Sequence, residues 1–402
     1  MADTGITVGL AAGMTDTESI QTFLAPRHLQ LAQEIAAFTR QEISPLSVAT
    51  EDAAARVQAR RILEILGRGG WYAHAVEREY GGCESGPDFR ACCLIRETLA
   101  SASPLADSVF ALQCLGSMPL TLAGSETQKR RHLRKIVAGD VMTAFAMTEP
   151  GAGSDVGGMK TTARRDGDSW VLDGQKWLIT NAGVADLYTV FAVTDPGAGT
   201  RGISLFLVEA GQPGFHFVGP QVLSEPHPLG EISFDGCRVP ADNLLGTLNE
   251  GFKTGMRTLD RLRCTVAAAA CGMASRALDE ALRHARERQQ FGQPLSNFQF
   301  TQQKLARMAT DLTAARLLTY RAAQLADSGA SRVTLEAAMA KSFATEAAQR
   351  IVDDAIQIWG GRGVLAESPV DRLYRAVRAL RIYEGATEVQ HMVIARQLLD
   401  RS

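Results

Sequence analysis

The sequence predicts an α+β protein with an N-terminal α-helical domain, a middle antiparallel β domain and a C-terminal domain like a four-helix bundle. Helical periodicity changes to short β-rich segments near residue 142, and long helical segments return after residue 245. This order differs from the strand–helix alternation of a parallel α/β fold and from a repeat array. A chain of 402 residues, 46% of them hydrophobic, can bury a large core.

The N-terminal domain is predicted over residues 25–141. Residues 1–24 are small and polar, and we expect them to form a flexible tail. Helical spacing of apolar residues predicts helices over residues 28–38, 90–99 and 126–137. Glycine and proline pairs divide these segments.

The middle domain is predicted over residues 142–245. Turn residues separate its segments at intervals of about ten residues, which favours an antiparallel sheet. Asp173-Gly174 is one of these predicted turns. The predicted strands cover residues 142–147, 169–173, 177–180, 187–194, 203–208 and 231–234.

The C-terminal domain is predicted over residues 246–402. Long helices are expected over residues 262–288 and 336–359, which have few helix breakers. Asp260 would lie at the start of the first helix, where an acidic side chain suits the helix dipole. Arg288 would lie at its end, where a basic side chain is a normal capping charge.

Composition argues against several classes of protein. The net charge is −2, so a nucleic-acid binder is not expected. Seven cysteines without a CxxC pair, and histidines without ligand spacing, predict no metal site. No early basic region or apolar run of about 20 residues is evident, so we expect a cytoplasmic protein without a membrane span.

One nucleotide-binding pattern occurs in an unsuitable context. Residues 361–366 fit GxGxxA, but a helical segment precedes them where a dinucleotide-binding site needs a strand. We therefore expect no Rossmann site.

Two further segments have both a functional and a structural interpretation. Residues 146–155 (AMTEPGAGSD) follow an apolar strand, and their glycines allow a ligand to approach the backbone closely, although an ordinary turn has the same composition. Glu384 lies among apolar residues, which raises a carboxyl pKa and suits a general base. Taken alone, this position favours a surface residue that caps a helix or pairs with Arg381.

Taken together, the motifs point to one family. AMTEPGAGSD, RERQQFG at residues 286–292, QIWGG at 357–361 and YEG at 383–385 occur in a characteristic order. Over nearly all of residues 25–400 the chain resembles the acyl-CoA dehydrogenase family. The resemblance implies a flavoprotein of fatty acid metabolism that binds FAD between the β domain and the C-terminal helices.

The resemblance also implies which residues contact FAD. Some of the matching positions reach the FAD of a neighbouring subunit, namely Arg288, Gln290, Gln299 and residues 357–361. We therefore expect a homotetramer built as a dimer of dimers. Leu178, Ala386 and Glu388 depart from common family residues. The full set of implied FAD contacts is Met147, Thr148, Gly153, Ser154, Leu178, Thr180, Arg288, Gln290, Gln299, Gln357, Gly361, Thr387 and Glu388.

For the substrate, the resemblance implies acyl-CoA held by Ser154, Asp260, Arg263 and Gly385. Glu384 matches the general base, which takes the α-proton of the thioester while the β-hydride passes to the flavin. Leu262 occupies the alternative base position and cannot accept a proton, so Glu384 is the only candidate.

The implied product is the trans-2-enoyl thioester, with an electron-transfer flavoprotein as the expected electron acceptor. Two alternatives on the same fold are a flavin oxidase or monooxygenase and a dehydrogenase of acyl-carrier-protein thioesters.

Overall fold

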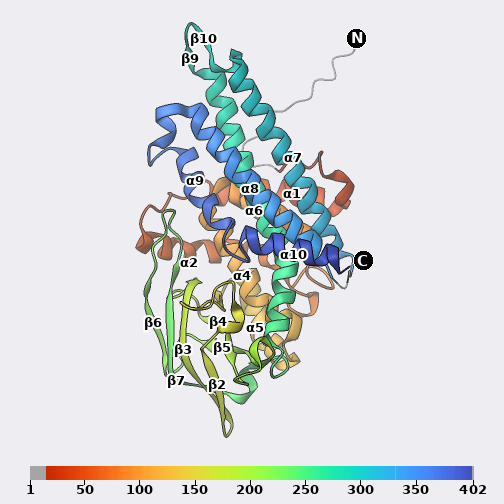
Figure 1. The fold of residues 1–402 in the computed structure, drawn as a ribbon, viewed down its shortest axis with the longest axis vertical. Coiled ribbons are helices and arrows are strands. Elements are labelled where there is room, and N and C mark those ends of the chain that lie inside the picture. The colour runs from red at the N-terminus through yellow and green to blue at the C-terminus, as the bar shows by residue number, and fades with distance from the viewer. Residues whose placement is uncertain (1–14, 331, 401–402) are drawn as a thin grey trace.

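The computed structural model describes residues 15–330 and 332–400. It confirms the predicted order of a helical region, a β region and a second helical region. The eight-stranded sheet lies at one end of the molecule, and the helices of both helical regions pack together at the other (Figure 1).

The N-terminal region comprises α1 (Pro26–Phe38), α2 (Asp52–Arg68), α3 (Phe89–Ala102), α4 (Pro104–Ala123) and α5 (Glu126–Ala138). Local signals explain several boundaries. The Asp88 side chain accepts the Ala91 N–H and caps α3, and Ser125 and Gln128 form a capping box at α5. Three of these helices match the three predicted segments.

The expected N-terminal tail needs correction. Residues 1–14 lie outside the described residues, but residues 15–24 pack against the helices. Ile20 is completely buried, and the Thr15 hydroxyl lies 3.3 Å from that of Thr98. Burial of a single isoleucine contributes about 1.5–3 kcal/mol, which opposes fraying of this segment.

The expectation that no segment could span a membrane was also too simple. Helix α4 has 20 residues with a mean hydropathy of 1.3, which is long and apolar enough for a span. However, 83% of that window is buried inside the protein. Its apolar character therefore reflects a position in the core.

The sheet has the strand order β6-β7-β3-β2-β4-β5-β8. It is mostly antiparallel, but β1 pairs with β4 in parallel, and so does the end of β2. The predicted antiparallel arrangement is therefore confirmed for most of the sheet, with these two parallel pairs as exceptions. The strands are β1 (Thr143–Ala146), β2 (Thr162–Asp166), β3 (Ser169–Thr180), β4 (Leu187–Val193), β5 (Ile203–Glu209), β6 (Phe215–Pro220), β7 (Leu229–Pro240) and β8 (Leu244–Leu245).

Strand β3 differs most from the prediction, because two expected strands form one. Its register against β7 shifts between Leu172 and Gly174 and again between Lys176 and Ile179. Gly174 has φ +141°, and a Cβ there would lie 2.7 Å from Thr161. The predicted turn is thus a β-bulge, a feature that glycine also favours. The sequence analysis missed β2 and β6.

The C-terminal region comprises α6 (Gly251–Glu287), α7 (Gln299–Asp327), α8 (Thr334–Trp359), α9 (Pro369–Leu380) and α10 (Thr387–Leu399). Helix α6 begins well before the predicted position, so Asp260 lies in its third turn. The dipole interpretation of Asp260 was wrong, because that effect falls off within the first turn. Helix α6 ends where predicted, and a short hairpin of β9 (Gln289–Gln290) and β10 (Gln293–Pro294) follows.

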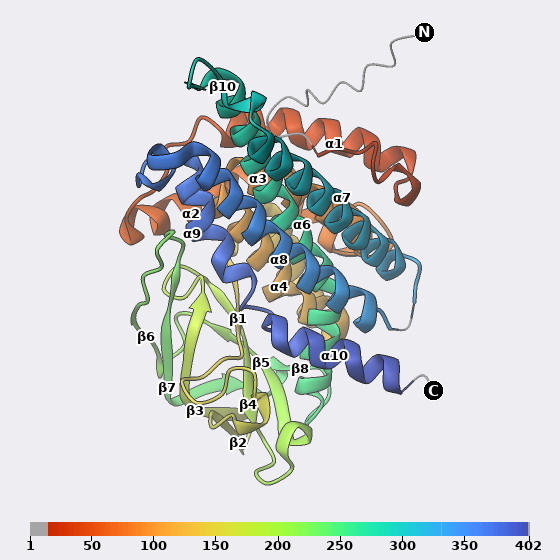
Figure 2. The same ribbon diagram turned by 45° about the horizontal axis from the view of Figure 1, so that its top comes forward.

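Helix α6 forms the centre of the helical body, and Figure 2 shows it among α3, α7 and α8. Its alanines at 267–270 are completely buried. A Cβ on Gly272 would lie 2.0 Å from the Glu97 carbonyl oxygen, so α3 and α6 approach closely only because this residue is glycine.

We predict that Gly272→Ala destabilises the protein. The added methyl group forces α3 and α6 apart at a cost of about 1–3 kcal/mol, which outweighs the gain in helix propensity of about 1 kcal/mol. Urea or thermal unfolding measures the effect. Gly211→Ala is the control, because its Cβ meets no atom within 4 Å, and should be nearly neutral. Equal stability of the two variants would contradict this packing argument.

Candidate active site

The glycine-rich loop after β1 has a rigid part and an open part. Glu149 and Ala152 exchange backbone hydrogen bonds of 3.1 Å, which close a tight turn. Gly153 and Ser154 follow this turn and are exposed, and Thr148 before it is half-buried. The loop thus presents two hydroxyl groups and exposed backbone amides to a ligand.

A buried ion pair between Lys176 on β3 and Glu149 holds this loop against the sheet. Lys176 on β3 is completely buried, and its Nζ lies 2.7 Å from Glu149 Oε1 and 3.2 Å from the Met147 carbonyl oxygen. Glu149 also accepts the backbone N–H groups of Lys160 and Thr161. Burial lowers the pKa of Lys176 to about 8, although Glu149 opposes this shift. Neither role was predicted, although Glu149 lies within the quoted AMTEPGAGSD motif.

The second bulge of β3 lies beside the loop. The Trp177 N–H donates to the Thr148 carbonyl oxygen at 2.9 Å, so the bulge and loop are adjacent. Leu178 has φ +54° and is 45% exposed. This left-handed conformation is unfavourable for leucine and turns its side chain outwards, a feature common at ligand sites. Thr180 ends the same strand and is half-buried.

These features fit a flat cofactor such as FAD. The hydroxyls of Thr148 and Ser154 and the open glycine amides provide hydrogen-bond donors, and Leu178 provides an apolar face. An exposed leucine held in a strained conformation is hard to explain by packing within the chain alone.

Helix α6 relates this loop to the predicted base. A Cβ on Gly255 would lie 3.0 Å from Met147 Cε, so the loop lies against the second turn of α6. Arg263, two turns further on, donates through Nε to the Glu384 carbonyl oxygen at 3.0 Å. The loop and the base therefore lie about 12 Å apart along the helix axis.

Glu384 lies in a strained turn between α9 and α10. Its φ is +53°, and that of Gly385 is +101°. Lys341 Nζ donates to the Gly385 carbonyl oxygen at 2.8 Å, and Gln390 donates to the same oxygen. The φ of Gly385 favours glycine, and a Cβ there would also displace the Gln390 amide, whose Nε2 would lie 2.2 Å away. Arg263 and Lys341 thus hold the left-handed turn through its two carbonyl groups.

Glu384 is half-buried, and one of its carboxyl oxygens lies in the interior. Its Oε2 is buried and has no hydrogen-bond partner among the described residues. Burial raises its pKa, against the opposing charges of Arg96 on α3, Arg263 on α6 and Lys341 on α8. A carboxylate with a raised pKa and a free oxygen can accept a proton from a ligand. Sequence analysis missed Arg96, because no local pattern relates it to Glu384.

Three predicted contact residues have partners within the chain. Asp260 binds Arg263 at 2.7 Å and accepts the Thr334 hydroxyl at 2.6 Å. The Thr387 hydroxyl donates to Glu346 at 2.7 Å. These bonds give all three residues a structural role whether or not they also contact a ligand. Glu388 is exposed. Among the described residues, it forms no hydrogen bond or ion pair with another predicted site residue.

A second group of predicted residues lies far from the first. Arg288 caps the far end of α6, 25 residues beyond Arg263, or about 38 Å along the axis. Gln290 lies in the hairpin, and Gln299 begins α7. Both are exposed, and Figure 1 shows the hairpin at the end opposite the sheet. One chain therefore does not bring these residues to the glycine-rich loop.

Residues 357–361 belong to the same remote group. Trp359 stacks on His284, one turn before Arg288, with ring centroids 4.8 Å apart. Gln357 and Gly361 are exposed on either side of it. The structure thus sorts the predicted FAD contacts into two separate sets.

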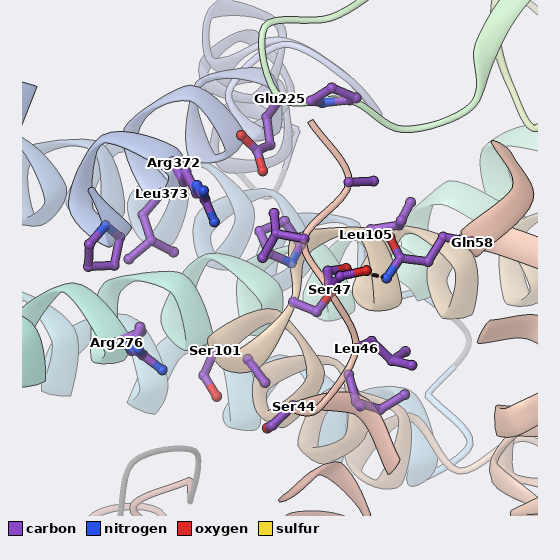
Figure 3. Close-up of a pocket in the computed structure, with 18 of the residues that line it drawn as sticks. Ser44, Leu46, Ser47, Gln58, Ser101, Leu105, Glu225, Arg276, Arg372 and Leu373 are labelled. Carbon is purple, nitrogen blue, oxygen red and sulfur yellow. Dashed lines mark hydrogen bonds between the residues drawn. The ribbon is translucent and has the colours of Figure 1, made fainter. Parts of the chain in front are cut away.

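Two neighbouring pockets lie among the N-terminal helices, the β6–β7 loop and α9, and one of them adjoins the base. One of about 200 Å³ lies between the N-terminal helices, the β6–β7 loop and α9 (Figure 3). Leu105 and Glu225 also line its neighbour of about 210 Å³. Tyr383, the residue before Glu384, lines the second pocket. The second pocket therefore adjoins the base.

Comparison with known proteins places the chain in a family. Models described as acyl-CoA dehydrogenase N-terminal, middle and C-terminal domains match residues 25–140, 144–237 and 249–399. Together they cover most of the chain.

Curated relatives match over nearly their full length. The chain is 41% identical to 3-(aryl)acrylate reductase from Clostridium sporogenes over 380 residues, covering 94% of this chain and all of the relative. It is 40% identical to human mitochondrial short-chain specific acyl-CoA dehydrogenase over 379 residues, covering 94% and 91%. It is also 40% identical over 350 residues to the caffeyl-CoA reductase–Etf complex subunit CarC of Acetobacterium woodii, covering 85% and 90%.

Solved structures agree. Butyryl-CoA dehydrogenase from Megasphaera elsdenii superimposes with a TM-score of 0.88 at 35% identity, covering 94% of this chain and 99% of that one. A glutaryl-CoA dehydrogenase from Mycobacterium smegmatis in complex with FADH2 gives 0.85 at 28% identity, covering 97% and 98%. The chain therefore belongs to the acyl-CoA dehydrogenase family of FAD-dependent oxidoreductases that act on CH–CH bonds.

Proposed function

We propose that this enzyme removes the α-proton of an acyl-CoA thioester with Glu384 and yields the trans-2-enoyl-CoA. The main support is the Glu384 carboxyl group, whose Oε2 is buried and has no hydrogen-bond partner in the described part of the chain. The residue also lies in a turn fixed by two cations. Fixing the backbone reduces the reorganisation that proton transfer requires. Burial raises the pKa of Glu384. This narrows the difference between the pKa of the base and that of the thioester α-carbon, so proton transfer becomes less unfavourable.

The glycine-rich loop and the β3 bulge would hold one end of FAD. Met147, Thr148, Gly153 and Ser154 supply backbone and hydroxyl contacts, and Leu178 and Thr180 cover a face. FAD supplies the acceptor for the β-hydride. Within the described residues no hydrogen bond uses the Glu384 N–H. That N–H is free to stabilise the negative charge that develops on the thioester oxygen.

Arg288, Gln290, Gln299, Gln357 and Gly361 would hold the FAD of a neighbouring subunit. The support is their separation from the loop by α6, which exceeds the length of one FAD molecule. A symmetric dimer would then contain two composite sites, and two dimers would form the proposed tetramer. We also propose a cytoplasmic location and an electron-transfer flavoprotein as electron acceptor, since one relative is a subunit of an Etf complex.

We predict that Glu384→Gln retains FAD and acyl-CoA binding but loses at least about 10²–10⁴-fold in turnover, because glutamine keeps the shape but cannot accept the proton. Steady-state assays with a dye acceptor measure the loss. Glu64→Gln, at an exposed position on α2, is the control and should stay active. Activity of Glu384→Gln within a few-fold of wild type would place the base elsewhere.

We predict that two inactive variants restore activity when co-expressed. One carries Glu384→Gln, and the other carries Arg288→Ala with Gln299→Ala. In a mixed dimer one site receives both defects and the other receives none, so random assembly restores about a quarter of wild-type activity. Co-purification through two affinity tags and a turnover assay measure this. No restoration in a mixed oligomer would show that each site lies within one chain.

We predict that oxygen is a poor acceptor. In the presence of acyl-CoA substrate, oxygen uptake should be far slower than reduction of an electron-transfer flavoprotein. The measurement compares an oxygen electrode with the absorbance of the acceptor protein. Oxygen uptake at the full turnover rate would favour the flavin oxidase alternative.

A further inference from the structure

A second buried ion pair, between Arg96 and Asp107, lies beside the proposed base. Arg96 Nε and Nη2 donate to the two carboxylate oxygens of Asp107 at 2.7 and 2.9 Å. Both side chains are 3% exposed. Arg96 Nη1 also donates to the Thr265 hydroxyl at 3.0 Å. The pair therefore links α3, α4 and α6 in the protein interior.

Stability alone does not explain this pair. Desolvation of two buried charges often costs more than their attraction returns, and apolar residues of similar volume serve a core at least as well. The surrounding core is rich in alanine, leucine and isoleucine, so an apolar alternative is compatible with this region.

The pair faces the Glu384 turn. Asp107 and Tyr383, the residue before Glu384, line the same 210 Å³ pocket. The Arg96 charge lowers the pKa of both Tyr383 and Glu384. Thr265, which orients Arg96, lies two residues from Arg263, which binds the Glu384 carbonyl oxygen. The charged groups facing Glu384 are thus Arg96, Asp107, Arg263 and Lys341, one from each of four helices.

We propose that the Arg96–Asp107 pair is a positioning device for Glu384, in which Arg96 attracts the carboxylate into the interior and Asp107 limits this attraction. The proposal rests on the role of Glu384 as base. Arg96 and Asp107 take no part in proton transfer themselves. Because Asp107 binds Arg96 through both oxygens, it neutralises much of the guanidinium charge that Glu384 would otherwise experience.

The two charges act on Glu384 with opposite signs. Among its charged neighbours Arg96 lowers the pKa of Glu384 the most, and Asp107 raises it to a smaller extent. Removing only the Asp107 charge must therefore lower this pKa. Removing both charges must raise it, since the larger opposing effect is lost. A base works when deprotonated, so kcat/KM rises as pH passes upward through its pKa.

The test uses Asp107→Asn and the double variant Arg96→Gln/Asp107→Asn. The rise in kcat/KM should move to lower pH in the first and to higher pH in the second, by on the order of one pH unit. The double variant leaves no buried charge unpaired, which protects folding. Asp327→Asn, which removes a carboxylate from another ion pair of α3, is the control and should leave the profile unchanged.

A second readout separates this proposal from that of the base. Infrared difference spectra, with Glu384→Gln as reference, follow protonation of Glu384 in the holoenzyme without turnover. Opposite shifts of its pKa in the two variants would support the proposal. If these shifts occur while the kinetic profile stays constant, the positioning role holds and the base assignment fails. An unchanged infrared pKa of Glu384 in both variants would overturn the proposal.

Discussion

The left-handed turn at Glu384 and Gly385 is the constraint on which the active site depends. A glutamate at φ +53° is unfavourable by itself, and persists only because the surrounding structure fixes it. Arg263 and Lys341 do so by binding successive carbonyl oxygens. Because these two side chains bind the carbonyl oxygens of the turn, the Glu384 N–H and carboxyl group remain available to the substrate. The same cations also lower the pKa of the carboxyl group, which burial raises, so these two side chains affect both the geometry and the acidity of the base.

Helix α6 fixes the distances between the parts of the site. Its second turn contacts the flavin loop, its fourth holds the base, and its far end presents Arg288. A straight helix of 37 residues cannot bring its two ends to one ligand. The geometry therefore favours a composite site between subunits. The close approach of α3 at Gly272 keeps Arg96 within reach of the base, which connects core packing with catalysis.

Sequence patterns predicted the parts of the structure that local chemistry determines. The three-region order, the segments that form α1, α3 and α5 and the end of α6 follow from periodicity and turn residues. The bulge at Gly174 was mistaken for a turn because both favour glycine. The start of α6 was misplaced because nothing near Asp260 marks it as interior. Ile20 was assigned to a tail, because its burial depends on tertiary contacts alone.

The site was predictable only in part, for a similar reason. Glu384 and the glycine-rich loop stand out through motifs. Arg96 and Asp107 lie more than 270 residues from Glu384, and no spacing relates them. Their relation to Glu384 follows only from the tertiary packing of α3, α4, α6 and α8.

The central claim is that Glu384 removes the α-proton. Deuterium exchange tests it most directly, with 3,3-dimethylbutyryl-CoA, which has α-protons but no β-hydrogen and so cannot be dehydrogenated. In D2O the wild-type holoenzyme should incorporate deuterium at the α-carbon, as followed by mass spectrometry, and Glu384→Gln should not. Equal incorporation by both proteins would contradict the account.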